Sequence, residues 1–223
     1  MFVATWVFSS RFGVDLIQKL GIHYPSSELF KPVQFVTHMF MHAGIWHIFF
    51  NMFALWMFGK VLESVWGSQR FFIYYIVTGL GAATIHLFVT YLRIRSITSG
   101  MDPEMVSMVY NQGLDVIASN KEFTVEAMNE LNMLINTPTV GASGAVYGVL
   151  LAFGMLFPNT ELMFLFPPVP IKAKYVVIGY GAIELFTGLT QPGSNVAHFA
   201  HLGGMLFGFI LIKYWNTKRT NFY

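Results

Sequence analysis

Long apolar stretches are the feature of this sequence that most restricts its fold. Several approach the roughly 20 residues that a helix needs to cross a bilayer. A segment in lipid must satisfy its own backbone hydrogen bonds, so it is a helix or part of a closed barrel. The runs are continuous rather than alternating, which argues against a barrel. They fall at residues 1–8, 45–58, 71–92, 140–157, 175–190 and 196–212.

Composition supports lipid as the solvent of these runs. Charged residues make up 11% of the chain, whereas a soluble domain carries roughly a quarter. The net charge is only +2 and no basic run is present, so a nucleic-acid partner is not expected. Cysteine is absent, which excludes disulfides, thiolate metal sites and cysteine nucleophiles. We predict an all-α membrane protein, a bundle of six transmembrane helices in a single domain over residues 1–223.

The segments between the runs differ in character. The first run is too short to span, so we expect residues 1–8 to be the end of a helix that begins upstream. Residues 18–44 form a long loop, 59–70 a short amphipathic connector, and 158–174 a proline-containing segment that cannot be one helix. Basic residues favour a cytoplasmic location for the segments 59–70, 158–174 and 213–223. Ser143 then lies at the outward-facing end of its helix.

The longest connector, residues 93–139, predicts an amphipathic helical insertion at about 97–138. Asp102 and Pro103 form a good helix start, a second helical pattern covers 121–135, and Pro138 ends it. We expect a helical hairpin that turns near residues 119–120. Our hypothesis is that it lies against the outer face and influences substrate access; the alternative is a solvated extension without function. The methionines proposed to form an adaptable contact surface are Met105, Met108, Met128 and Met133.

Three polar clusters interrupt the apolar runs. His47 and Asn51 are four residues apart and therefore share a helix face, and Ser143 and Tyr147 repeat that spacing. The sixth run begins NVAHFAHLGG, which places His198 and His201 one turn apart. Ionisable groups are costly in lipid, so histidines in membrane helices favour a function. Taken alone, however, Ser143 is equally well explained as an ordinary helix-start serine.

Glycine spacing predicts which helices meet. The patterns Gly144-AVY-Gly148 and Gly204-MLF-Gly208 are small-xxx-small motifs that let membrane helices approach closely. Close packing of these two faces would bring the Ser143 hydroxyl within reach of the His201 imidazole. One such motif is weak evidence, whereas two motifs beside complementary catalytic residue types are stronger.

This set of residues suits acyl transfer. A serine hydroxyl becomes nucleophilic when a histidine removes its proton, and the resulting oxyanion needs hydrogen-bond donors. His47 and Asn51 are the predicted donors, and Tyr147 is predicted to support the imidazole ring. No acidic residue lies near Ser143 or His201 in sequence, so the prediction is a Ser-His dyad.

At this point the chain resembles the rhomboid intramembrane serine proteases, through GASGAVYG, HIFFN and AHLGGMLFG. The resemblance implies Ser143 as nucleophile, His201 as general base, and His47 and Asn51 as oxyanion donors. It further implies cleavage of single-span membrane proteins in or near the lipid bilayer, without a cofactor. We expect a location in the bacterial inner membrane, with the active site opening to the outer side. Residues assigned a structural role near the site are Gly141, Gly144, Gly148, Gly204, Gly208 and Glu63, the last as a brace of the first loop.

The chain also departs from the family and leaves alternatives open. The family's first loop often has Trp-Arg where this chain reads Val33-Gln34, so the stability of that loop can differ. Zinc intramembrane proteases need HExxH and aspartyl types need paired membrane aspartates; neither feature is found. Histidines 38, 42 and 47 are too loosely spaced for a metal site, and none is expected. The remaining alternative is a catalytically silent membrane scaffold or transporter of related fold.

Overall fold

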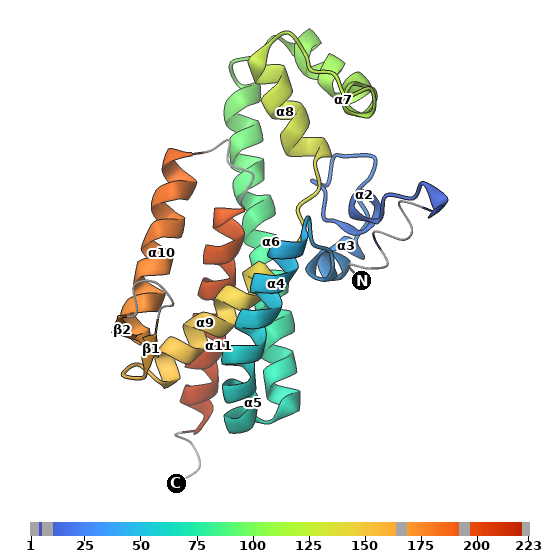
Figure 1. Ribbon diagram of the computed structural model, residues 1–223. Helices are drawn as coiled ribbons and strands as arrows, with labels where there is room; N and C mark the ends of the chain where they lie inside the picture. The colour runs from blue at the N-terminus through green and yellow to red at the C-terminus, as the bar shows by residue number, and fades with distance from the viewer. Residues whose placement is uncertain (1–4, 6–10, 164–168, 192–196, 220–223) are drawn as a thin grey trace. The chain divides into compact units, whose positions relative to one another are not determined.

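The computed structural model describes residue 5 and residues 11–163, 169–191 and 197–219. Of these, residues 217–219 are described by their backbone alone. The predicted apolar run 1–8 therefore lies outside the described residues, except for Thr5. The chain divides into two compact units. The first unit comprises residues 1–43 and 86–140, and the second comprises 44–85 and 141–223. Helix α6 (Ser68–Thr98) contributes to both (Figure 1).

The second unit opens with one long helical segment. Helix α4 (Ile45–Ala54) continues through a π-helical turn, η2 (Leu55–Gly59), into α5 (Lys60–Trp66). The prediction of a separate connector at 59–70 was wrong, because helical structure persists to Trp66. The break comes at Gly67, whose φ of +79° is a left-handed conformation that favours glycine. Helix α6 begins one residue later.

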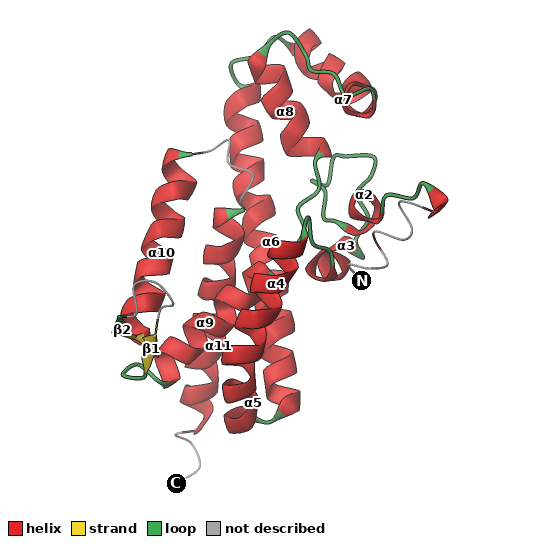
Figure 2. Cartoon of the chain, in the orientation of Figure 1, coloured by secondary structure: helices red, strands yellow, loops and turns green. Residues whose placement is uncertain are grey.

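The remaining predicted runs of the second unit also form helices. These are α9 (Ser143–Leu156), α10 (Ala173–Thr190) and α11 (His198–Arg219). In the proline-containing segment, the described residues 158–163 and 169–172 form no helix, and they contain strands β1 (Glu161–Met163) and β2 (Pro170–Lys172). Residues 164–168 of this segment lie outside the described residues. The two strands pair as a short antiparallel ladder (Figure 2). Apart from this ladder the described regular structure is helical, and the all-α prediction is confirmed.

Helix α9 lies at the centre of the second unit. Val149, Ala152 and Phe153 are buried and pack in one cluster with Tyr74 of α6 and Ile212 of α11. Within the described chain, two helical segments are long and apolar enough to cross a membrane, Ile45–Trp66 and Ser68–Thr98. Helix α9 is also apolar but shorter.

The first unit contains the predicted helical hairpin. Asp102 caps helix α7 (Pro103–Ala118) by accepting a hydrogen bond from the Glu104 N–H at 2.8 Å. The chain turns at Asn120, with φ of +51°, and helix α8 (Glu126–Asn136) ends before Pro138. Two helices joined near residue 120 are present, but α8 begins at Glu126 rather than near residue 121, and α6 continues to Thr98. That residues 97–138 form an insertion, and that this hairpin affects substrate access, both stay predictions.

One methionine of the hairpin does not belong to the proposed contact surface. Met128 is only 4% exposed and packs with Val109, Leu131 and Ile135 in the core of the first unit. Its place in the sequence is one turn before Leu131, on the face that α8 buries. The other three methionines, 105, 108 and 133, are exposed.

The first loop is organised around Gln34, which is fully buried. Short elements flank it: α2 (Leu16–Leu20), α3 (Gln34–Thr37) and the 3₁₀-helix η1 (His38–Phe40). The Gln34 side-chain oxygen accepts from the backbone N–H groups of His23 and Lys31, at 3.3 and 3.1 Å. Its amide nitrogen donates to the carbonyls of Lys19 and Leu29, at 3.2 and 2.9 Å. At the position where the family often has Arg, this chain thus has a glutamine that forms four hydrogen bonds within the loop, and we call Gln34 the hub of the loop.

Replacing Gln34 with Leu should open this loop. The change leaves two N–H groups and two carbonyls without their partner, and each buried orphan costs about 1–3 kcal/mol. Hydrogen–deuterium exchange should show faster exchange at the amides of His23 and Lys31. Gln112→Leu, at an exposed position of α7, is the matched control and should leave both amides protected. Unchanged exchange in Gln34→Leu would contradict the assignment of a hub.

Candidate active site

Ser143 and His201 meet in the second unit. Ser143 is the first residue of α9 and is partly exposed, whereas His201 lies in the first turn of α11 and is 8% exposed. Their Oγ and Nε2 atoms are 2.8 Å apart. This is the distance at which a hydroxyl donates its proton to an unprotonated ring nitrogen. The two residues that the sequence analysis paired are therefore in hydrogen-bond contact, 58 positions apart in the chain.

Glycines explain how the two helices come so close. A Cβ atom on Gly204 would collide with the backbone carbonyl oxygen of Gly144, so α9 and α11 touch backbone to backbone at this point. The predicted contact between the two motifs is confirmed for this pair. Gly148 and Gly208 instead face α6, where their neighbours are Thr78 and Tyr74. The motifs therefore fix a junction of three helices, not a simple pair.

Gly141 joins the nucleophile to the predicted oxyanion donors. Its φ of +128° is unfavourable for other residues. A Cβ at this position would lie 2.8 Å from the His47 ring and 3.7 Å from the Ser143 Oγ, so His47 and Ser143 border the same small space. Asn51 is buried and donates one N–H to the His47 carbonyl at 2.8 Å. Its amide has a second N–H.

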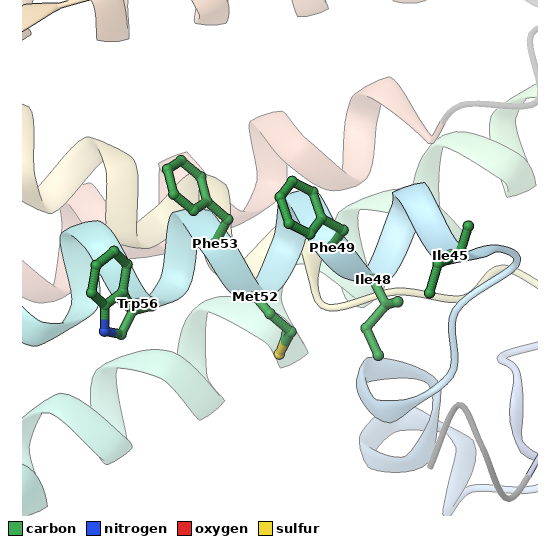
Figure 3. Close-up of a pocket in the computed structure, with 6 residues that line it drawn as sticks. All are labelled: Ile45, Ile48, Phe49, Met52, Phe53 and Trp56. Atoms are coloured by element: carbon green, nitrogen blue, oxygen red, sulfur yellow. The ribbon is translucent and has the colours of Figure 1, made fainter.

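Helix α4 presents two different faces. His47 and Asn51 lie on one side of it, and an open apolar hollow runs along the opposite side, as the 100° step per residue requires. Figure 3 shows the side chains of this hollow along the helix. The apolar face suits contact with lipid, which leaves the polar face for the site. The residues that line the hollow are Ile45, Ile48, Phe49, Met52, Phe53 and Trp56.

Glu184 of α10, which the sequence motifs did not indicate, completes the polar cluster. This carboxyl is 6% exposed, and its Oε2 lies 3.0 Å from Nδ1 of His201. The prediction that no acidic residue lies beside the Ser143–His201 pair was therefore wrong. A signal was present, because a lone carboxylate inside the apolar run 175–190 is costly in lipid and needs a partner.

Two further residues contact this carboxylate. Tyr147 donates its hydroxyl proton to Oε1, and Nδ1 of His198 lies 2.6 Å from Oε2. The Tyr147 ring also stacks on the His201 imidazole, with centroids 4.2 Å apart and planes within 5°. The predicted support of the imidazole by Tyr147 thus has the expected geometry. Tyr147 in addition connects His201 to Glu184.

The same cluster is the one grouping of histidine and acidic residues in the described chain that could surround a metal ion: Glu184, His198 and His201. Nitrogen and oxygen ligands about 2 Å from a tetrahedral zinc ion stand roughly 3.3 Å from each other. The Glu184 oxygen is only 2.6 Å from His198 and 3.0 Å from His201. These are distances for sharing a proton, and the ligands would have to move apart to admit a metal.

Glu63, predicted to brace the first loop, is on α5 and half-buried. Within the described part of the chain its carboxylate makes no hydrogen bond or ion pair, so its role stays a prediction.

If the predicted acyl-transfer chemistry is correct, His47→Ala and Asn51→Ala should each lower turnover by about 10²–10³-fold, because each removes one predicted oxyanion donor. Both proteins should remain folded, since neither change creates a collision. Gly141→Ala should give a similar loss by displacing the His47 ring. Gly100→Ala is the matched glycine control, because a Cβ there has no neighbour closer than 4.0 Å. Steady-state turnover and thermal unfolding of each variant measure the effect; full turnover in both donor variants would leave them structural.

Comparison with known proteins gives a family match that includes every residue of this site. The model of the rhomboid domain family matches residues 30–215. The chain is 25% identical over 176 residues to "Rhomboid protein 1, mitochondrial" of Saccharomyces cerevisiae, covering 79% of this chain and 40% of that protein. It is 26% identical over 175 residues to "Rhomboid protease GluP" of Bacillus subtilis, covering 78% and 24% respectively.

A plant relative gives a longer match. The chain is 27% identical over 206 residues to "RHOMBOID-like protein 12, mitochondrial" of Arabidopsis thaliana, covering 92% of this chain and 52% of that protein. The chain thus spans between a quarter and about half of the length of these relatives.

Proposed function

This chain belongs to the rhomboid family of integral membrane proteins, and we propose that it is an intramembrane serine endopeptidase. Its proposed substrates are single-span membrane proteins, which it cleaves at peptide bonds in or near their transmembrane segments. It requires no cofactor. The observation that best supports this proposal is the 2.8 Å contact between the Ser143 hydroxyl and Nε2 of His201. The chain belongs to a family of integral membrane proteins.

The proposed chemistry is acyl transfer through Ser143. Its Oγ bonds to the scissile carbonyl carbon while His201 Nε2 accepts the hydroxyl proton and the carbonyl electron pair moves to oxygen. Side-chain N–H groups of His47 and Asn51, with the backbone N–H of Ser143, stabilise that oxyanion. The backbone group is available because the first N–H groups of a helix have no partner within it.

The first intermediate then collapses to an ester. The carbonyl re-forms, the carbon–nitrogen bond breaks, and His201 returns the proton to the leaving nitrogen. A water molecule attacks the Ser143 ester in the same way, giving its proton to His201. The bond between the acyl carbon and the Ser143 oxygen then breaks, and His201 returns its proton to that oxygen, which releases the carboxyl product and restores the hydroxyl.

The proposed setting is one rhomboid domain in a bilayer, with residues 97–138 as an insertion and the site opening to the side opposite the basic C-terminal tail. The relatives bear both bacterial and mitochondrial names. They favour no single membrane, and the expected bacterial inner membrane is therefore not part of the proposal.

Reconstitution tests the function. The chain in liposomes should cleave a doubly tagged single-span substrate at a bond in or beside its span. A fluorophosphonate should abolish cleavage, and peptide mass spectrometry should find the reagent on Ser143. Absence of both cleavage and labelling would refute the proposal in favour of a silent scaffold of the same fold.

A further inference from the structure

Glu184 is a buried carboxylate that contacts three side chains, all from helices other than its own. Tyr147 donates to its Oε1, and the Nδ1 atoms of His198 and His201 both approach its Oε2, at 2.6 and 3.0 Å. The side chain is 8% exposed, so water does not take the place of these groups. An ionised carboxylate is an acceptor only, which determines where the protons of its neighbours must be.

The protonation of His201 follows from its two ring contacts. Its Nε2 faces the Ser143 hydroxyl, and its Nδ1 faces Glu184. The Nδ1–Oε2 contact has the distance of an ion pair but does not meet the geometry of a hydrogen bond, and within the described chain Nδ1 has no hydrogen-bond partner. A neutral imidazole carries one proton. With that proton on Nδ1, toward the carboxylate, Nε2 is left as the base that Ser143 requires.

His198 and Tyr147 hold the carboxylate in this place. His198 is closer to Oε2 than His201 is, and its Nδ1 also lies 3.1 Å from the Thr187 hydroxyl. Tyr147 fixes the other oxygen, while its ring covers the face of His201. Three helices, α9, α10 and α11, therefore each contribute a residue that restricts Glu184 or the base.

We propose that Glu184 is the positioning residue of His201, anchored by His198 and Tyr147. It keeps the His201 proton on Nδ1 and compensates the positive charge that forms when Nε2 accepts the serine proton. The inference rests on the proposed protease function and extends its Ser-His pair to a Ser-His-Glu relay. A charge formed in a site of low dielectric gains far more from a carboxylate at this distance than it would in water.

Glu184→Gln tests the relay, because an amide keeps the shape and removes the charge. We expect kcat to fall by about 10²–10⁴-fold with KM for a single-span substrate little changed, since the lost interaction develops in the transition state. His198→Ala should cost about 10–100-fold, as loss of an outer partner does. Tyr180→Phe is the matched control: Tyr180 lies on the same helix and contacts only the Tyr147 ring among the interactions described for it. It should retain full kcat.

Nitrogen-15 NMR of histidine-labelled protein measures which ring nitrogen of His201 carries the proton. This would not change if Glu184 had a structural role alone. The His201 signal, assigned by its loss in His201→Ala, should report a proton on Nδ1 in the parent protein and on Nε2 in Glu184→Gln. A proton on Nε2 in the parent, or normal kcat in a folded Glu184→Gln, would overturn the relay. A parent chain with neither cleavage nor Ser143 labelling would refute the protease function instead. The NMR measurement would still decide the protonation of His201.

Discussion

Ser143→Ala and His201→Ala should each abolish proteolysis, with turnover lower by about 10⁵–10⁶-fold. In the proposed mechanism the two residues act as one unit, because the hydroxyl is a nucleophile only when Nε2 removes its proton. The double variant should therefore be no worse than either single one. Cleavage of a single-span substrate in liposomes, followed by gel analysis and by fluorophosphonate labelling of Ser143, measures both effects.

His198 provides the discriminating comparison for His201. It lies one turn earlier on α11 and contacts Glu184, whereas His201 is the histidine whose Nε2 lies 2.8 Å from the Ser143 Oγ. His198→Ala should therefore retain measurable labelling where His201→Ala retains none. Ser119→Ala, at an exposed position beyond α7, controls for the loss of a serine hydroxyl. If His201→Ala kept near-normal turnover and His198→Ala lost it, the general base would be His198 and the assignment of His201 would be wrong.

Gly204→Val should destabilise the second unit by more than about 3 kcal/mol, above the usual range for an overpacked core. A Cβ alone at this position would already overlap the Gly144 carbonyl, and backbone cannot swing aside as a flexible side chain can. The separation of α9 and α11 would also move the Ser143 hydroxyl away from Nε2. Fluorophosphonate labelling should therefore be lost together with thermal stability in detergent.

Gly179→Ala is the matched control for that variant. Gly179 lies within α10, and a Cβ there would meet nothing within 4 Å. Alanine has the higher helix propensity, by about 1 kcal/mol, so the control should be neutral or slightly stabilising. Equal melting temperatures for Gly204→Val and Gly179→Ala would show that the helices can separate without cost.

Local pattern determined much of this protein. Continuous apolar runs require helices in lipid, so the helical class and the positions of α9, α10 and α11 could be predicted. The i, i+4 spacing put His47 with Asn51 and Ser143 with Tyr147 on shared faces, because an α-helix repeats every 3.6 residues. The cap formed by Asp102 and Pro103 was equally local and equally predictable.

Helix ends were less predictable than helix positions. Hydropathy falls after residue 58, yet the helix runs on to Trp66 because nothing in the backbone stops it before Gly67. Met128 likewise looked like a surface residue in a methionine-rich segment. Its burial depends on Val109 and Ile135, which only the packing of α7 and α8 brings to it.

Tertiary structure alone decided how the site is completed. The motifs placed Ser143 and His201 on glycine faces that could meet, because small residues are a local sign of close approach. Glu184 shows only that it needs a partner, as a lone carboxylate in an apolar run; it is 41 residues from Ser143, and no motif indicates which residue the partner is. Only the crossing of α9, α10 and α11 places its carboxylate against His201, and an electrostatic contact through space leaves no pattern in the order of residues. The sequence by itself thus determined the helices and the pairing of Ser143 with His201, and the packing of those helices supplied the carboxylate.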